Sequence, residues 1–117
     1  MTTPASQNFT AARTTLFVVG SGVQLDTVRR VVPHLKRPAA VLDLWSLGIR
    51  SVEEVKLPGH LPPVTLSRMR SVGEVAKGWA RATDGGVLVT PQDVGLVYRR
   101  VIAAARHGGA SIVLLGY

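Results

Sequence analysis

Four short apolar runs divide the chain, and the segments between them have the period of amphipathic helices. The runs cover Leu16–Gly20, Ala39–Leu44, Gly86–Thr90 and Ser111–Leu115. Their apolar residues are nearly continuous, whereas a strand with one face in water would alternate apolar and polar side chains. Such runs are typical of parallel strands that are covered on both faces, and this restricts the chain to a small set of α/β folds.

Three of the intervening segments place apolar residues on one helical face. The first begins in "GSGVQ", where Ser21 and Gln24 have the spacing of a capping box, and Pro33 is expected to shorten it. The second leads from Leu66 to Thr83, and the third from Val94 to Ala105. The alternation predicts a single Rossmann-like or flavodoxin-like α/β domain, with a four-stranded, mainly parallel sheet and helices on both faces.

The expected domain covers residues 15–117, because a chain of 117 residues has the size of one domain. Residues 1–14 show no apolar periodicity and are interpreted as a disordered tail. A further short helix is expected to begin at the capping-box pattern of residues 51–54, before "LPGHLPP" breaks the chain.

Composition narrows the functional classes. The absence of cysteine excludes disulfides and thiolate metal sites, and it fits a reducing compartment such as the cytoplasm. The three histidines are scattered without ligand-like spacing, and the apolar runs are far shorter than the roughly 20 residues that cross a bilayer. The net charge of +7 favours anionic partners, although eleven of the fourteen basic residues are Arg, a bias that GC-rich coding also produces. We therefore expect a cytoplasmic protein, with nucleic acid as a less favoured partner.

Polar side chains follow three of the apolar runs, where the carboxyl ends of parallel strands would meet at one edge of the sheet. The glycines of "GSG" suit a tight turn, and the helix that follows presents N–H groups able to bind a phosphate or carboxylate. The same residues would serve equally as a structural turn that Ser21 caps. The predicted ligand-binding residues are Gly20, Ser21, Gly22, Gln24, Asp43, Trp45, Thr90, Gln92 and Asp93.

These residues do not complete a nucleotide-binding motif. A dinucleotide fingerprint has the form G-x-G-x-x-G, and Leu25 stands where the third glycine belongs. Asp43 lies near the spacing of a ribose-binding acid, and Asp93 suits the N-cap of the third helix. The sequence contains no P-loop motif and no pairing of a nucleophile with a base, so neither catalytic residues nor a cofactor can be specified.

The stretches "LFVVGSGVQLDTVRRVVPHL", "AAVLDLW" and "VLVTPQDVGLVYRRVIAAARHGGASIVLL" follow one another in an order that resembles the N-terminal, Rossmann-like half of GT-B-type glycosyltransferases of bacterial surface-polysaccharide synthesis. The resemblance implies a transferase-related domain that binds a nucleotide sugar or another anionic ligand at the carboxyl ends of the strands, on the acceptor side of a cleft. It also implies a second domain, which makes the chain either a fragment or a lone half. The apolar end "SIVLLGY" is then expected to meet that domain or a protein partner.

Two alternatives stay open. One is a regulatory or protein-interaction module without catalysis, because this fold does not fix a function. The other is DNA binding, because "LGIRSVEEVKLPGHLPP" resembles the first helix and hairpin of a helix-hairpin-helix motif. That second resemblance implies contacts to DNA phosphates from Lys56, Gly59, Arg68 and Arg70.

Overall fold

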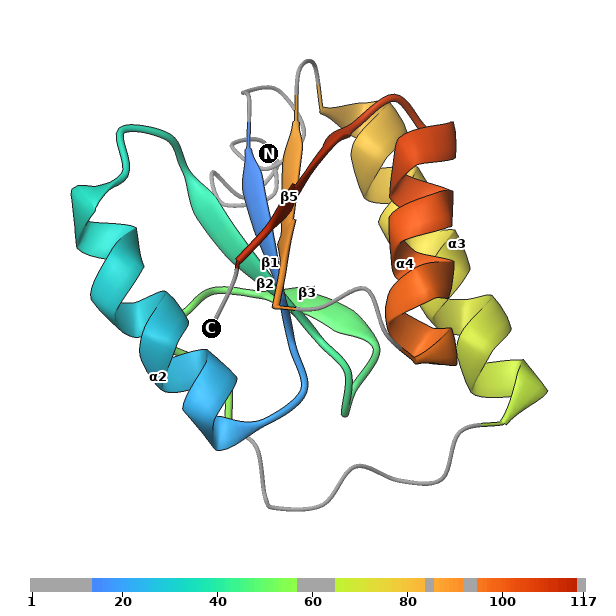
Figure 1. Cartoon of the computed structure of the whole chain (residues 1–117), viewed down its shortest axis with the longest axis horizontal. Helices are drawn as coiled ribbons and strands as arrows, with labels where there is room; N and C mark the ends of the chain where they lie inside the picture. The colour runs from blue at the N-terminus through green and yellow to red at the C-terminus, as the bar shows by residue number, and fades with distance from the viewer. Residues whose placement is uncertain (1–13, 57–64, 84–85, 92–94, 116–117) are drawn as a thin grey trace, which may run out of the picture.

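A five-stranded sheet forms the centre of the computed structural model, which describes residues 14–56, 65–83, 86–91 and 95–115 (Figure 1). The strands are β1 (Thr15–Val19), β2 (Ala39–Asp43), β3 (Gly48–Arg50), β4 (Val87–Thr90) and β5 (Ser111–Leu114). They lie in the order β3-β2-β1-β4-β5. All neighbours are parallel except β3, which runs antiparallel to β2. The α/β class and the mainly parallel sheet are confirmed, with five strands in place of the expected four.

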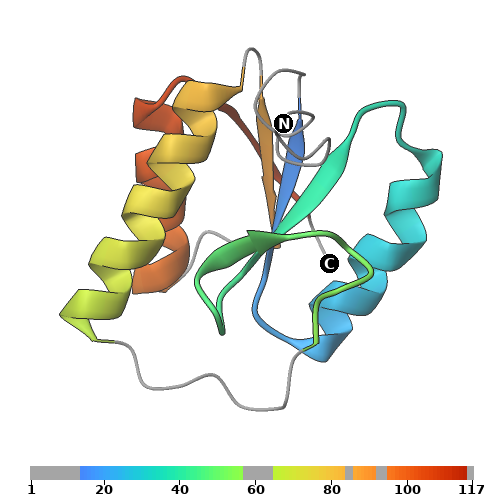
Figure 2. The ribbon, with the colours of Figure 1, turned by 180° about the vertical axis from the view of Figure 1, so that it is seen from behind.

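Helices cover both faces of this sheet, as the apolar periodicity predicts. Helix α2 (Gly22–Val31) lies on one face, and α3 (Leu66–Ala82) and α4 (Leu96–His107) pack side by side on the other (Figures 1 and 2). The short 3₁₀ helix η1 (Val32–His34) follows α2 and contains Pro33. Proline lacks the N–H that an α-helix needs, which explains why α2 stops at this point.

The core consists of two apolar layers, one on each face of the sheet. In β1, Leu16 and Val18 belong to the layer under α3 and α4, whereas Phe17 and Val19 belong to the layer under α2. Successive side chains of a strand point to opposite faces, so a strand buried on both faces must be apolar throughout. Trp79 of α3 is also buried in the first layer.

The segment after β2 differs from the prediction. Residues 52–54 form a turn, so the expected helix at residues 51–54 is wrong, and β3 is a strand that the apolar pattern did not indicate. Val52 and Val55 are instead buried in the layer under α2. The Nη2 group of Arg29 donates to their carbonyl oxygens, at 3.5 and 3.0 Å respectively. These tertiary contacts outweigh a capping-box pattern whose effect is only local.

Two further expectations need correction. Thr14, assigned to the tail, is fully buried, and its carbonyl accepts a hydrogen bond from the Val87 N–H at 2.9 Å, so it belongs to the folded domain. Residues 1–13 lie outside the described part of the chain. Leu66, expected on the buried stripe of α3, is 81% exposed because it is the first residue of the helix. None of the described helices is long and apolar enough to cross a membrane.

Candidate functional site

The turn between β1 and α2 is a capping box, as predicted. Ser21 is the N-cap of α2, and its Oγ accepts a hydrogen bond from the Gln24 N–H at 3.3 Å. The Gln24 side chain reaches back, and its Oε1 accepts from the Gly20 N–H at 2.8 Å. The turn therefore satisfies two of its own donors, which supports a structural role for these residues.

Gly22 is exposed, and a Cβ built on it would meet no atom within 4 Å. Its φ is not positive, since Gly95 and Gly109 are the described glycines with that conformation. The fold thus does not require glycine at this position, contrary to the interpretation of Gly22 as a turn-forming residue. What glycine provides here is an open approach to the backbone at the start of the helix.

The chain leaves β1 and β4 toward opposite faces of the sheet, because α2 and α4 cover different faces. In open α/β sheets, ligands bind outside the carboxyl ends of two such adjacent strands. At this point the buried Tyr98 of α4 donates its hydroxyl to Gln24 Oε1 at 3.3 Å. Thr90, at the end of β4, is buried as well. The structure therefore brings Gly20, Ser21 and Gln24 together and adds Tyr98, for which the local sequence holds no signal.

Asp43 organises the connection from β2 to β3. Its Oδ1 accepts a hydrogen bond from the backbone N–H of Trp45 at 2.8 Å, and its Oδ2 accepts one from the Ser46 hydroxyl at 3.1 Å. The Nε of Arg50 lies 3.8 Å from Oδ2. Asp43 is buried, and donors of its own turn occupy both oxygens. This geometry favours a structural role over the predicted contact with a ribose.

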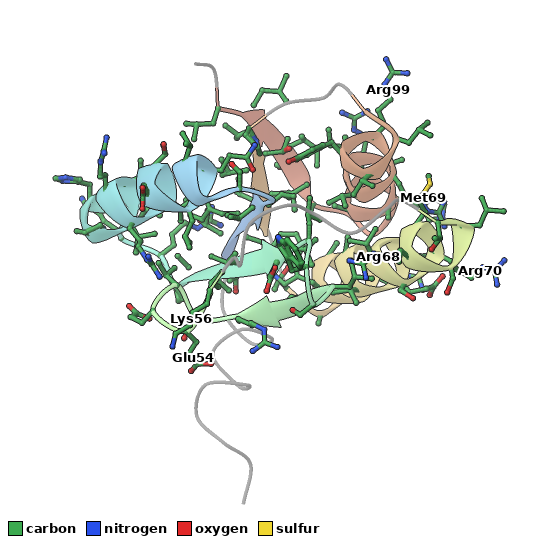
Figure 3. The ribbon with its side chains drawn as sticks, turned by 90° about the horizontal axis from the view of Figure 1, so that it is seen from below. Glu54, Lys56, Arg68, Met69, Arg70 and Arg99 are labelled. Carbon is green, nitrogen blue, oxygen red and sulfur yellow. The ribbon has the colours of Figure 1, made fainter. Side chains whose placement is uncertain are left out.

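An open cavity of about 430 Å³ lies beyond the end of β2. Part of the Trp45 indole is buried, including an N–H that has no hydrogen-bond partner among the described residues. The part of the ring that remains accessible is consequently hydrocarbon, which suits stacking on another ring. Figure 3 shows Glu54 and Lys56 next to each other. The lining residues are Asp43, Trp45, Ser46, Arg50, Glu54 and Lys56.

The expected DNA contacts do not form one surface. The Nη2 of Arg68 donates to the carbonyl oxygens of Leu44 and Trp45, at 2.8 and 3.0 Å, so this guanidinium holds the turn after β2. This geometry supports a structural role for Arg68, and its contact with DNA stays a prediction. Lys56 and Arg70 lie on opposite sides of the view in Figure 3. Gly59 lies outside the described residues.

Two of the predicted ligand-binding residues, Gln92 and Asp93, also lie outside the described residues. Gly95, with a φ of 101°, occupies the N-cap position of α4. The prediction that Asp93 caps this helix is therefore wrong. Among the described residues, no group of three or more His, Asp or Glu side chains is placed to hold a metal ion.

Comparison with models of protein families, with curated proteins and with solved structures finds no match. The function is therefore inferred from the geometry of the site alone.

Proposed function

We propose that this domain binds a nucleotide, a nucleotide sugar or a related anionic ligand at the carboxyl edge of its sheet. The observation that carries the proposal is the cavity after β2, in which the hydrocarbon part of Trp45 lies beside a hydroxyl and charged side chains. Open α/β sheets bind ligands at this edge, and few well-placed polar groups around an apolar surface are typical of small-molecule sites.

The residues of the cavity suit a ligand that has both hydroxyl groups and negative charge. Arg50 and two local donors compensate the charge of Asp43, which leaves Lys56 and Glu54 as the exposed ionic groups. The Lys56 ammonium would pair with a phosphate, and the Glu54 carboxylate would accept from sugar hydroxyls. The opposite charges of these two side chains favour a mixed ligand over a bare anion.

The start of α2 would complete this site. Val19 pairs with Asp43, and the Leu44 N–H donates to the Val19 carbonyl at 3.0 Å, so the turns after β1 and β2 are neighbours on one edge. A helix N-terminus favours negative charge, and Gly22 leaves its backbone accessible. Because Gln24 and Ser21 already occupy two donors of the turn, we expect weak, millimolar-range affinity.

The same site fits the acceptor-side half of a glycosyltransferase that works in the cytoplasm. This extension rests on the order of the strands and helices along the chain, which resembles that of the N-terminal half of GT-B-type glycosyltransferases. The described residues contain no assembled nucleophile and base, so the proposal for this chain is binding, and transfer would need groups from a second domain.

Tryptophan fluorescence tests the proposal, because the chain has two tryptophans in different places. UDP-glucose, corrected for its absorption, should change the emission of the wild type and of Trp79→Phe, but not that of Trp45→Phe. Lys56→Gln should weaken binding about threefold to tenfold, as for the loss of one partly exposed ion pair. Arg81→Gln, a charge change on an exposed residue of α3, is the matched control. An unchanged signal with UDP-glucose, UDP and phosphate at 10 mM, or an equal response of Trp45→Phe, would contradict the proposal.

A further inference from the structure

The outer edge of β5 is exposed and apolar. β5 ends the sheet, and no described strand pairs with its outer side. Its sequence, Ser-Ile-Val-Leu, contains neither a charge nor a proline, and Val113 and Leu114 are 45% and 53% exposed. Proteins usually protect such edges with charged residues, prolines or bulges, because the free backbone N–H and C=O groups can pair with another chain. β5 has none of these side-chain protections.

A groove of about 420 Å³ lies beside this edge, between β5 and α4. The alternation of the strand places Ile112 and Leu114 on the α4 side and Val113 on the side of α2. Arg99 and Arg106 line the groove from α4, and Figure 3 shows Arg99 extending outward from this helix. The remaining lining residues are Ile102 and Ala103. The groove thus combines an apolar floor with two guanidinium groups, and α4 carries no acidic residue.

We propose that β5 and this groove form a docking site for an extended, acidic segment of a partner protein, which joins the sheet as a sixth strand. The backbone of the segment would pair with the open edge of β5, as in other cases of strand addition. Alternate side chains of a strand share one face, so the side chains of the segment on the α4 face would place apolar residues beside Leu114 and carboxylates near Arg99 and Arg106.

Charge distinguishes this partner from a second copy of the chain. Two β5 strands that paired around a twofold axis would place both α4 helices on the same face of the joined sheet. The arginines of the two helices would then approach one another, and like charges across an interface are unfavourable. A nucleic acid would contact the arginines through its phosphates but would leave Leu114 and the strand edge unused. An acidic peptide matches the charge, the apolar floor and the edge together.

The experiment measures the fluorescence anisotropy of a labelled eight-residue peptide with the repeat Glu-Glu-Val-Val, which presents both Glu and Val on each face of a strand. It should bind the full chain, and Arg106→Glu should weaken binding at least tenfold, because a repulsion replaces an attraction. Leu114→Ser should weaken it several-fold. Arg81→Glu, the same reversal in the last turn of α3, is the matched control and should have little effect. Circular dichroism of each variant verifies that it is folded.

Two changes to the peptide test strand addition. Replacing Glu by Lys should abolish binding, and N-methyl groups on alternate residues should abolish it by removing the donors of one edge. Hydrogen exchange should slow at residues 111–115 when the unmodified peptide binds. The proposal would be overturned if the N-methylated peptide bound as tightly as the unmodified one. It would also be overturned if Arg81→Glu and Arg106→Glu weakened the binding of the peptide equally. Stronger binding of duplex DNA with the same dependence on Arg106 and Leu114, or formation of a dimer that excludes the peptide, would overturn it as well.

Discussion

The two edges of the sheet are built in opposite ways. β3 has three residues, runs antiparallel, and ends with the exposed Arg50, which donates to Ser46 Oγ at 3.1 Å and lies near Asp43. β5 is parallel and uncharged, and its last residues are exposed and apolar. Both are edge strands, but the edge at β3 is short and ends in a charged residue, whereas the edge at β5 carries no charge. Length and charge are among the features that protect an edge from pairing, so of the two edges β5 is the one suited to a partner.

The largest effect should come from the turn that leads into β5. A Cβ on Gly108 would lie 2.7 Å from Ala80 Cβ and 2.9 Å from the Lys77 carbonyl oxygen, so Gly108→Ala must push α4 away from α3. We expect a loss of about 2–3 kcal/mol in the free energy of unfolding, measured with urea. Gly73→Ala is the matched control, because its Cβ would meet only the movable side chain of Arg100. An equal loss in both variants would contradict the steric explanation.

Asp43→Ala should have the next largest effect, at the opposite edge. The substitution removes a buried carboxylate that accepts from the backbone N–H of Trp45 and from the Ser46 hydroxyl. The loss of these two hydrogen bonds should lower the free energy of unfolding by about 2 kcal/mol. Asp43→Asn keeps one acceptor oxygen, so its free energy of unfolding should fall by less. Urea unfolding of both variants provides the measurement, and a stable Asp43→Ala protein would mean that β3 does not depend on this turn.

Arg68→Met should lower the stability by about 1 kcal/mol, because the guanidinium donates to two carbonyls of the turn after β2. Methionine keeps much of the length and the apolar contacts of the side chain. Arg70→Met, on the exposed side of the same helix, should leave the midpoint of urea unfolding unchanged. A comparable loss of stability in Arg68→Met and Arg70→Met would show that the two hydrogen bonds of Arg68 do not contribute to stability.

The smallest effect is expected for Val113→Lys. The side chain is already 45% exposed, so the change in stability should be less than about 0.5 kcal/mol. The added charge should also reduce any self-association of the edge, which sedimentation velocity would detect. A large loss of stability would instead show that this face of β5 is covered.

The sequence predicts the elements whose stabilisation is local or strongly patterned. The four parallel strands, the three long helices and the Ser21–Gln24 capping box follow from apolar period and cap chemistry. β3 was missed because its three residues, Gly48–Arg50, carry no apolar pattern, and its pairing depends on the turn around Asp43.

The candidate site was predictable only in outline. Asp43 and Trp45 are predictable because they lie at the end of a strand, but Glu54 is not, because it reaches the cavity through the irregular segment after β3. The hydrogen bond between Tyr98 and Gln24 joins residues 74 positions apart, and neither residue type specifies the other. Arg68 appeared to be a surface cation, since a sequence does not show which guanidinium groups find carbonyl partners.

The two arginines that hold the segment of residues 44–56 have a consequence for its motion. Arg68 of α3 donates to the carbonyls of Leu44 and Trp45, and Arg29 of α2 donates to those of Val52 and Val55. Helices on both faces of the sheet thus hold the segment that contains β3. Such a segment cannot fray from one end, because each end is attached to a different helix. It should open as a unit, with amide exchange rates that are uniform along it and that rise together when either arginine is replaced.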